Sequence, residues 1–320
     1  MSIMQAARVG FAALTFGAIF AIAAGPAAGQ VVGLAAMQPG SLNHTTATAI
    51  AKVAKEKAGL NTLVQPTAGE SVIIPIVARG EAEFGIANSL EVLVATEGGK
   101  LSELRMIGAI HPLFTAYFVR KSSPMMTIAD LKGKKVVSGF SAQRTLDISG
   151  RAVLAAGGLG DKDYSPVMVP NVIRGADDFV SGASDTFFFA FGAPKVREVD
   201  ATVGGIRALE VPVSGMDAAR KIFAEGYLAP AAPNPFFIGV EKPMGVYTWD
   251  NMLFTNAKVK DEIVYKMIEA MAKNKDDLIT VQPALRAFTP GGLYKKFSTP
   301  YHPGALKYFA DNKIEIRTAQ

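Results

Sequence analysis

The sequence predicts an α/β fold of two lobes, each an open, doubly wound and mostly parallel sheet, with a ligand cleft between the lobes. Three observations lead to this fold class. The chain has 320 residues, 49% of them hydrophobic, which is enough for two domains of ordinary size. Short apolar runs alternate with stretches of helical spacing. A polar turn between a strand and a helix occurs at 37–44 and recurs at 139–145.

The segment 1–29 has the pattern of a secretory signal peptide. It carries one basic residue, Arg8, then an apolar stretch that ends in small residues. We expect cleavage before Gln30, with a cut after Gly25 as the alternative. A retained membrane anchor stays open, because the uncharged run approaches the ~20 residues that span a bilayer. The mature chain is expected to be soluble and exported.

The composition excludes several classes of chemistry. Cysteine is absent, so there is no thiol nucleophile, disulfide or thiolate metal site. The three histidines, His44, His111 and His302, are scattered, and neither a metal site nor a cofactor is expected. The net charge of +5 is not gathered into a basic block with interleaved aromatic residues. Nucleic acid is therefore not an expected partner.

The first lobe begins with the order strand, turn, helix. The continuous apolar run at 31–36 predicts a buried parallel strand, and residues 47–58 have helical spacing. The alternation continues with a helix at 71–78 and with strands at 63–66, 84–87, 105–110 and 114–119. We expect His111 and Pro112 to form a turn between the last two strands.

The second lobe repeats this build. We expect strands at 136–139, 167–169 and 186–191, and helices at 146–156 and around 177–180. The proline-rich segment 229–235 marks a boundary, because each proline lacks a donor and restricts its predecessor. Beyond it, a helix at 263–271 is expected to return to the first lobe. The predicted division is lobe I from 30–119 and 231–320, and lobe II from 120–230.

Two strand–turn–helix junctions, 37–44 and 139–145, are the best candidates for a binding site. A helix N-terminus offers unpaired N–H groups and a positive dipole end, which suit a carboxylate. Arg144 is expected to pair with that carboxylate through two hydrogen bonds. The other side chains expected to bind the ligand are Ser41, Asn43, His44, Asn88, Ser89, Ser141, Gln143 and Thr145. The alternative is that Ser41 and Ser141 only cap their own helices.

The sequence contains no motif for nucleotide binding or for serine hydrolase chemistry. The sequence contains neither of the glycine-rich phosphate motifs, nor the G-x-S-x-G elbow of a serine hydrolase. His44 is therefore expected to be a neutral ligand contact or a plain first-turn residue. Phe191, at the carboxyl end of the strand at 186–191, is expected to reach the cleft, because ligands bind outside the carboxyl ends of such strands.

Four segments occur in the order known from one family of solute receptors. They are RGEAEFGIANS at 79–89, IADLKGKKV at 128–136, the stretch 181–194 ending in Gly-Ala-Pro, and DEIVY at 261–265. Together they resemble the TAXI branch of the receptors of tripartite ATP-independent periplasmic (TRAP) transporters, over nearly all of the mature chain. The chain departs from that pattern at both junctions: it has Leu42-Asn43-His44 in place of glycines and a tyrosine, and Ala142-Gln143-Arg144 in place of Gly-Ser-Gly.

The resemblance implies a fold like that of type II periplasmic binding proteins. It implies a monomeric periplasmic receptor, not an enzyme, that captures a small organic anion, carboxylate or amino-acid-like, and delivers it to a TRAP-type permease. Capture is expected to proceed by hinge closure, with crossing segments near Val119 and Pro230. The alternatives are a binding protein of an ABC or tripartite tricarboxylate transporter, a secreted α/β enzyme, and an anchored sensory protein.

Overall fold

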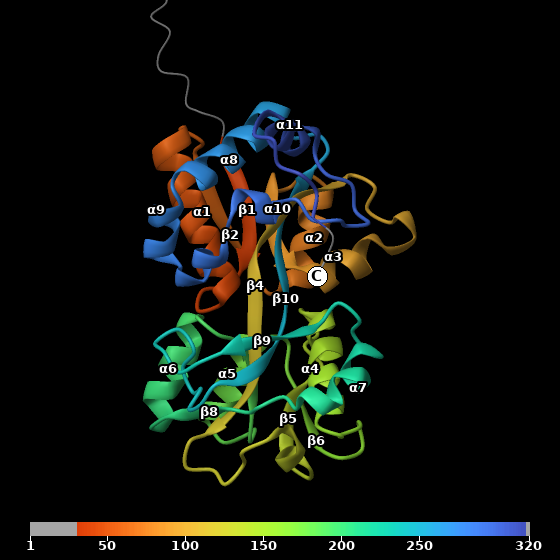
Figure 1. Cartoon of the computed structure of the whole chain (residues 1–320), viewed down its shortest axis with the longest axis vertical. Helices are drawn as coiled ribbons and strands as arrows, with labels where there is room; N and C mark the ends of the chain where they lie inside the picture. The colour runs from red at the N-terminus through yellow and green to blue at the C-terminus, as the bar shows by residue number, and fades with distance from the viewer. Residues whose placement is uncertain (1–30, 318–320) are drawn as a thin grey trace, which may run out of the picture.

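Two lobes are stacked along the long axis of the molecule in the computed structural model, which describes residues 31–317 (Figure 1). The predicted leader, 1–29, lies outside the described residues. We call residues 31–110 and 252–317 lobe I, and residues 114–248 lobe II. The two short segments between them, 111–113 and 249–251, form the waist. The fold is a mixed α/β fold with an open sheet, as the sequence predicted.

The sheet of lobe I has the strand order β2-β1-β3-β10-β4. The first three strands, β1 (Val32–Met37), β2 (Thr62–Thr67) and β3 (Phe84–Asn88), are parallel. The long strands β10 (Met244–Asn256) and β4 (Leu104–Arg120) then add antiparallel pairs. Both long strands run on into lobe II, so one sheet extends through the whole molecule.

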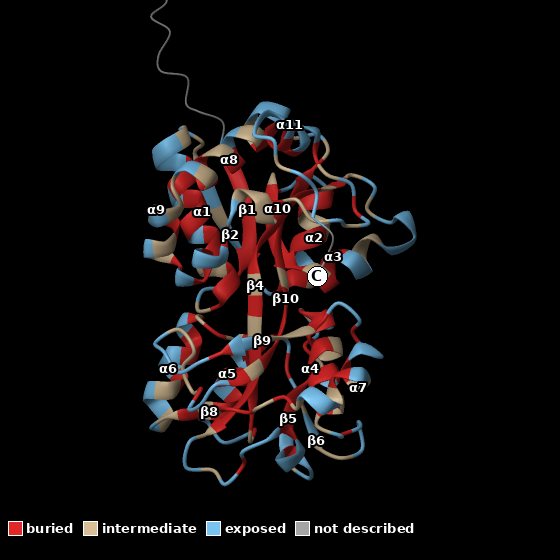
Figure 2. Cartoon of the chain, in the orientation of Figure 1, coloured by how far each residue is buried: buried red, intermediate tan, exposed pale blue. Residues whose placement is uncertain are grey.

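Helices cover both faces of the sheet in lobe I, and β1 shows why. Its alternate side chains Val32 and Leu34 lie in one apolar cluster, while Ala35 and Met37 lie in the other. The first face carries α1 (Leu42–Ala58), α8 (Asp261–Lys273), α9 (Lys275–Val281) and α11 (Pro303–Asp311). The second carries α2 (Glu70–Ala78) and α3 (Ser89–Thr96). Figure 2 shows the buried strands between these helices.

Lobe II is built around the far halves of the two long strands. Three short strands pair with them, namely β7 (Phe187–Ala190), β8 (Ile206–Ala208) and β9 (Tyr227–Ala231). A separate parallel pair consists of β5 (Lys135–Ser138) and β6 (Ser165–Met168). The helices are α4 (Arg144–Ala156), α5 (Val172–Val180), α6 (Pro194–Val203) and α7 (Met216–Arg220). Short helical turns occur at Glu97–Gly99, Ile128–Leu131, Val213–Gly215, Pro283–Ala287 and in α10 (Pro290–Leu293).

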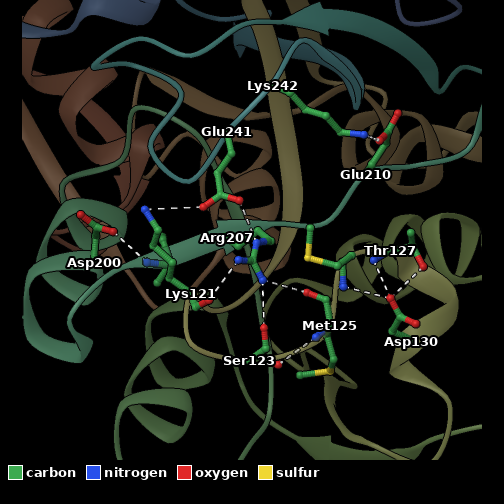
Figure 3. Close-up of polar contacts among 12 residues, drawn as sticks. Lys121, Ser123, Met125, Thr127, Asp130, Asp200, Arg207, Glu210, Glu241 and Lys242 are labelled. Carbon is green, nitrogen blue, oxygen red and sulfur yellow. Dashed lines mark hydrogen bonds and ion pairs between the residues drawn. The ribbon is translucent and has the colours of Figure 1, made fainter.

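Arg207 of β8 fastens the loop that follows β4 at the far end of lobe II (Figure 3). Its guanidinium donates to the main-chain carbonyls of Lys121, Ser123 and Met125 at 3.0, 2.9 and 3.2 Å. It also pairs with Glu241 at 3.0 Å. One side chain thus satisfies carbonyl groups that no strand reaches.

The predicted turn at His111 and Pro112 is wrong, because both residues lie inside the continuous strand β4. His111 pairs with Asn251 and Pro112 with Asp250, and a register shift follows in β10. A proline lacks a donor, but β7 pairs with β4 only from Thr115 onward. At the waist β4 therefore has a free side, where a missing donor is tolerated.

The crossing between the lobes lies at the waist and not near Val119 and Pro230, where it was expected. Val119 pairs with Arg207, and Pro230 pairs with Gly245, so both lie within lobe II. Among residues 31–317, no helix is both long enough and apolar enough to cross a membrane.

Candidate functional site

In the described part of the chain, six helices have their N-termini at the contact between the lobes. From lobe I these are α1, α2 and α3, and from lobe II α4, α5 and α6. The lobes touch directly here: Asn171, the cap of α5, donates to the carbonyl of Ala68 at 3.1 Å, and the N–H of Ser71 donates to the carbonyl of Ala142 at 3.2 Å. Helix N-termini carry a positive dipole end, so this contact favours groups of negative charge.

A cavity of about 40 Å³ remains between the lobes at this point. Its polar lining consists of Ser41, Asn43, Glu70 and Thr115. The rest is apolar: Met37, Leu42, Leu113, Leu146, Val172, Phe188, Phe189, Ala190 and Trp249. Both lobes and the waist contribute, so any movement of the lobes changes the size of the cavity.

Glu70, the first residue of α2, is the most unusual group in this lining. It is 4% exposed, and its carboxyl oxygens accept hydrogen bonds from the side chain of Asn43 and from the main chain and side chain of Asn88. Burial and the nearby Glu91 carboxylate raise the pKa of Glu70 to about 8, although these hydrogen bonds oppose the shift. No Lys, Arg or His of the described residues forms an ion pair with it.

Glu91 of α3 reaches across from lobe I to the N-terminus of α4 in lobe II. It accepts hydrogen bonds from the N–H of Thr145 at 3.2 Å and from its hydroxyl at 2.5 Å. Ser71 donates to its other oxygen at 2.6 Å and accepts from the N–H of Arg144. An internal carboxylate therefore takes the position where the sequence predicts a ligand carboxylate.

The residues of the first junction have different roles: some cap the helix or fix the end of β1, and some line the cavity. Ser41 caps α1 by accepting from the N–H of His44 at 3.0 Å, which matches the capping alternative, and it also lines the cavity. Asn43 is buried and fixes the end of β1 by accepting from the N–H of Met37 at 2.9 Å. His44 is partly exposed, and burial lowers its pKa, so its ring favours the neutral form.

The residues of the second junction mainly join the lobes. Gln143 is buried, accepts from the N–H of Val172 at 2.9 Å and contacts Met37 of lobe I. Thr145 is held by Glu91. The side chains of Ser141 and Arg144 are exposed. The predicted pairing of Arg144 with a ligand carboxylate thus stays a prediction, and it applies to the rim of the contact.

Three predicted residues, Asn88, Ser89 and Phe191, do not line this cavity. Asn88 caps α3 and donates to Glu70, so it supports the cavity from behind. Ser89 instead lines a second, larger hollow beside the waist, of about 470 Å³, together with Asp250 and Lys295. Phe191 is fully buried against Phe118 and Phe237 and does not reach the cavity. The aromatic residues that line the cavity are instead Phe188 and Phe189 of β7.

Sequence reasoning missed Glu70, Glu91 and Trp249. Glu70 looks like an ordinary acidic residue in the first turn of a helix. Its burial depends on Asn43 and Asn88, which the chain brings in from other elements. Trp249 is the single tryptophan of the chain, and its place opposite Leu113 at the waist follows from a strand pairing that the sequence does not reveal.

The histidine of the waist is uncharged and tightly packed. His111 is buried, and its ring lies 3.1 Å from the hydroxyl of Thr46 and 3.3 Å from the side-chain amide of Asn251. Burial lowers the pKa of His111 to about 4, so the ring is uncharged at neutral pH. Among the described residues, no group of three or more His, Cys, Asp or Glu side chains is placed to hold a metal ion.

Comparisons with known proteins give first the class and then the family. The fold is that of periplasmic binding proteins. A solved structure described as a periplasmic transporter has a TM-score of 0.58 and 15% identity over 88% of this chain and 92% of its own. The alkanesulfonate-binding protein SsuA from Xanthomonas axonopodis pv. citri, bound to MOPS, has a TM-score of 0.50 and 13% identity over 90% and 98%. A model of the NMT1-like family matches residues 19–312, so the chain belongs to the NMT1-like family.

Proposed function

We propose that the protein is an exported solute-binding receptor that traps a small organic compound between its lobes and delivers it to a membrane permease. One observation carries this proposal: helix N-termini of both lobes close on a small cavity beside a waist of only two strands. Such a waist permits hinge closure around a ligand. We also propose that the predicted leader is removed and that the receptor is a monomer in the periplasm.

We propose a permease class other than the one first expected. Neither the matching family nor the two similar structures are described as TAXI or TRAP receptors. The ABC-type alternative that the sequence left open fits these findings better, and we propose it as the transporter class. The genes beside this one test the choice: an ATPase gene next to a permease gene supports the ABC type, and a TRAP permease gene overturns it.

The ligand class that we propose is a small carboxylate or amino-acid-like compound. The exposed Arg144 at the rim could meet its carboxylate when the lobes are open. The buried N-terminus of α4 is not free for that purpose while Glu91 binds Thr145. A ligand carboxylate inside the closed contact would therefore have to displace Glu91.

The test is thermal unfolding of the mature protein against a panel of small organic acids and amino acids. A ligand at 100 times its dissociation constant adds about 2.7 kcal/mol to the free energy of unfolding. We expect a few related compounds to raise the melting temperature without being converted. A flat panel would contradict the proposed receptor function, and turnover of a bound compound would favour the secreted-enzyme alternative.

A further inference from the structure

The polar groups around the interlobe cavity differ in whether their bonding capacity is filled. Ser41 both donates to the carbonyl of Gln38 and accepts from an N–H. Asn43 uses its amide oxygen and both amide hydrogens. Thr115 donates to the carbonyl of Tyr247 at 2.8 Å. These three side chains are therefore satisfied without a ligand.

Two groups differ from these three. Glu70 accepts three hydrogen bonds, but it is a buried carboxyl group with no cation beside it among the described residues, and the carboxylate that acts on it, Glu91, is also acidic. Trp249 is 1% exposed, lines the same cavity, and its indole N–H has no hydrogen-bond partner within the described part of the chain. Buried polar groups in native proteins nearly always have partners, so the indole N–H indicates a missing acceptor. The buried Glu70 carboxyl group has hydrogen-bond donors, and what it lacks is a positive charge.

The missing partners differ in chemistry. A buried carboxylate is stabilised by a positive charge, and the face of a tryptophan ring attracts cations as well. The indole N–H only donates, and it therefore needs an acceptor atom. The anion-binding end of α4 is already taken by Glu91, so the cavity itself offers a carboxylate and a donor, and no cation.

We propose that the inner end of the cleft binds a protonated nitrogen of the ligand against Glu70, with an adjacent acceptor atom of the ligand facing Trp249. This inference rests on the proposed receptor function and narrows its ligand class to compounds that carry a cationic nitrogen. The bound nitrogen replaces the proton on the Glu70 carboxyl group, and that proton leaves to the solvent. A cavity of about 40 Å³ holds a group of the size of an ammonium ion, because one water needs roughly 10–15 Å³.

The experiment uses three matched sets of probes on the mature full chain: amino acids, the corresponding 2-hydroxy acids, and the corresponding primary amines. Binding is followed by melting temperature and by the fluorescence of Trp249, the single tryptophan. We expect the amino acid to bind at least about tenfold more tightly than its 2-hydroxy acid, because a hydrogen bond between charged groups is lost in the latter. Equal affinity for both would overturn the inference and leave the receptor function standing. If no probe binds, the receptor function for this ligand class fails, and the inference fails with it.

Two variants test whether Glu70 and Trp249 contact the ligand. Glu70→Gln should weaken binding of the nitrogen compound by about tenfold or more, and Trp249→Phe, which keeps the aromatic ring, by about threefold to tenfold. Asp217→Asn is the matched control, since it removes one negative charge from a side chain that is 94% exposed on α7. Unchanged affinity in Glu70→Gln would overturn the inference. Should that variant not fold, the comparison of amino acid and 2-hydroxy acid on the unaltered protein still decides.

Discussion

The Glu91 side chain is one of the groups that join the two lobes. Its carboxylate accepts from the main chain and hydroxyl of Thr145, which lies in the other lobe. Ser71 extends the contact by bonding both Glu91 and the N–H of Arg144. The closed contact is thus held by groups of the protein itself, with a carboxylate at a helix N-terminus, where its charge is favoured.

The pH dependence of the free energy of unfolding should reveal the raised pKa of Glu70. Burial raises its pKa from 4.5 to about 8, so the unfolded chain loses this proton near pH 4.5 while the folded chain keeps it to about pH 8. The folded state therefore loses stability, relative to the unfolded chain, as the pH rises through this window. Between pH 5 and pH 8 we expect Glu70 to lower the free energy of unfolding by up to about 4 kcal/mol.

Urea unfolding at both pH values checks this expectation. In Glu70→Gln the decrease between pH 5 and pH 8 should be smaller than in the unaltered protein by that amount. Asp217→Asn should keep the full decrease, because its side chain is exposed. The same pH dependence in all three proteins would show that Glu70 has an ordinary pKa.

The candidate site could be predicted only in part at the level of residues. Ser41, Asn43 and Gln143 were chosen because they follow strands in polar turns, and that rule is local. The structure does place these three at the contact between the lobes. Glu70 and Glu91 could not be found in this way, since their role depends on which distant donors surround them.

At the scale of elements, Gly69 sets how closely α2 approaches α4. A Cβ atom at this position would lie 2.1 Å from the carbonyl oxygen of Ala142 in the other lobe. Its backbone is extended, so alanine brings no backbone strain of its own. Gly69→Ala should therefore act as a wedge that holds the lobes apart.

Small-angle X-ray scattering of the ligand-free protein measures this effect. We expect Gly69→Ala to have a larger radius of gyration than the unaltered protein. Gly160→Ala serves as the control, because the nearest atom to its Cβ would be 3.7 Å away, which is an ordinary contact. An unchanged scattering curve for Gly69→Ala would mean that the lobes do not meet at this residue in solution.

The loop after β4 depends on one side chain of β8. Arg207 is largely buried and bonds three main-chain carbonyls, so Arg207→Ala leaves these groups without partners. We expect it to lower the free energy of unfolding by about 2 kcal/mol or more, measured by urea unfolding. Arg220→Ala removes an exposed pair with Asp217 and should cost less than about 0.5 kcal/mol. Equal effects of both variants would argue against this role of Arg207.

Many elements follow from local patterns, whereas β8, β10, α6 and α11 were not predicted. The apolar run of β1 and the helical spacing of α8 predict their elements within a few residues. The division of β4 into two strands was wrong because Pro112 suggests a break. The proline is tolerated because β4 has one free side there, which is a property of the assembled sheet.

At the scale of the whole molecule, the two long strands β4 and β10 form part of the sheet in both lobes. Each lobe adds its own strands to the β4–β10 pair: β3 on one side of the waist, and β7, β8 and β9 on the other. At residues 112–113 of β4 and 249–250 of β10, no third strand of the described chain pairs with the two long strands. We therefore expect any relative motion of the lobes to concentrate at residues 111–113 and 249–251.

The waist also means that lobe II is an insert within the chain of lobe I. The residues that bound it, Leu113 and Trp249, pair with each other in an antiparallel ladder, so the two ends of the insert lie side by side. Joining residue 110 to residue 252 by a short turn should give a separate folded domain, since neighbouring antiparallel strands need only a few residues between them. Circular dichroism and a cooperative melting curve would check this, and a disordered product would contradict it. Lobe II is therefore one contiguous insert with adjacent ends, and a different domain could be inserted at this point without changing the strand order of lobe I.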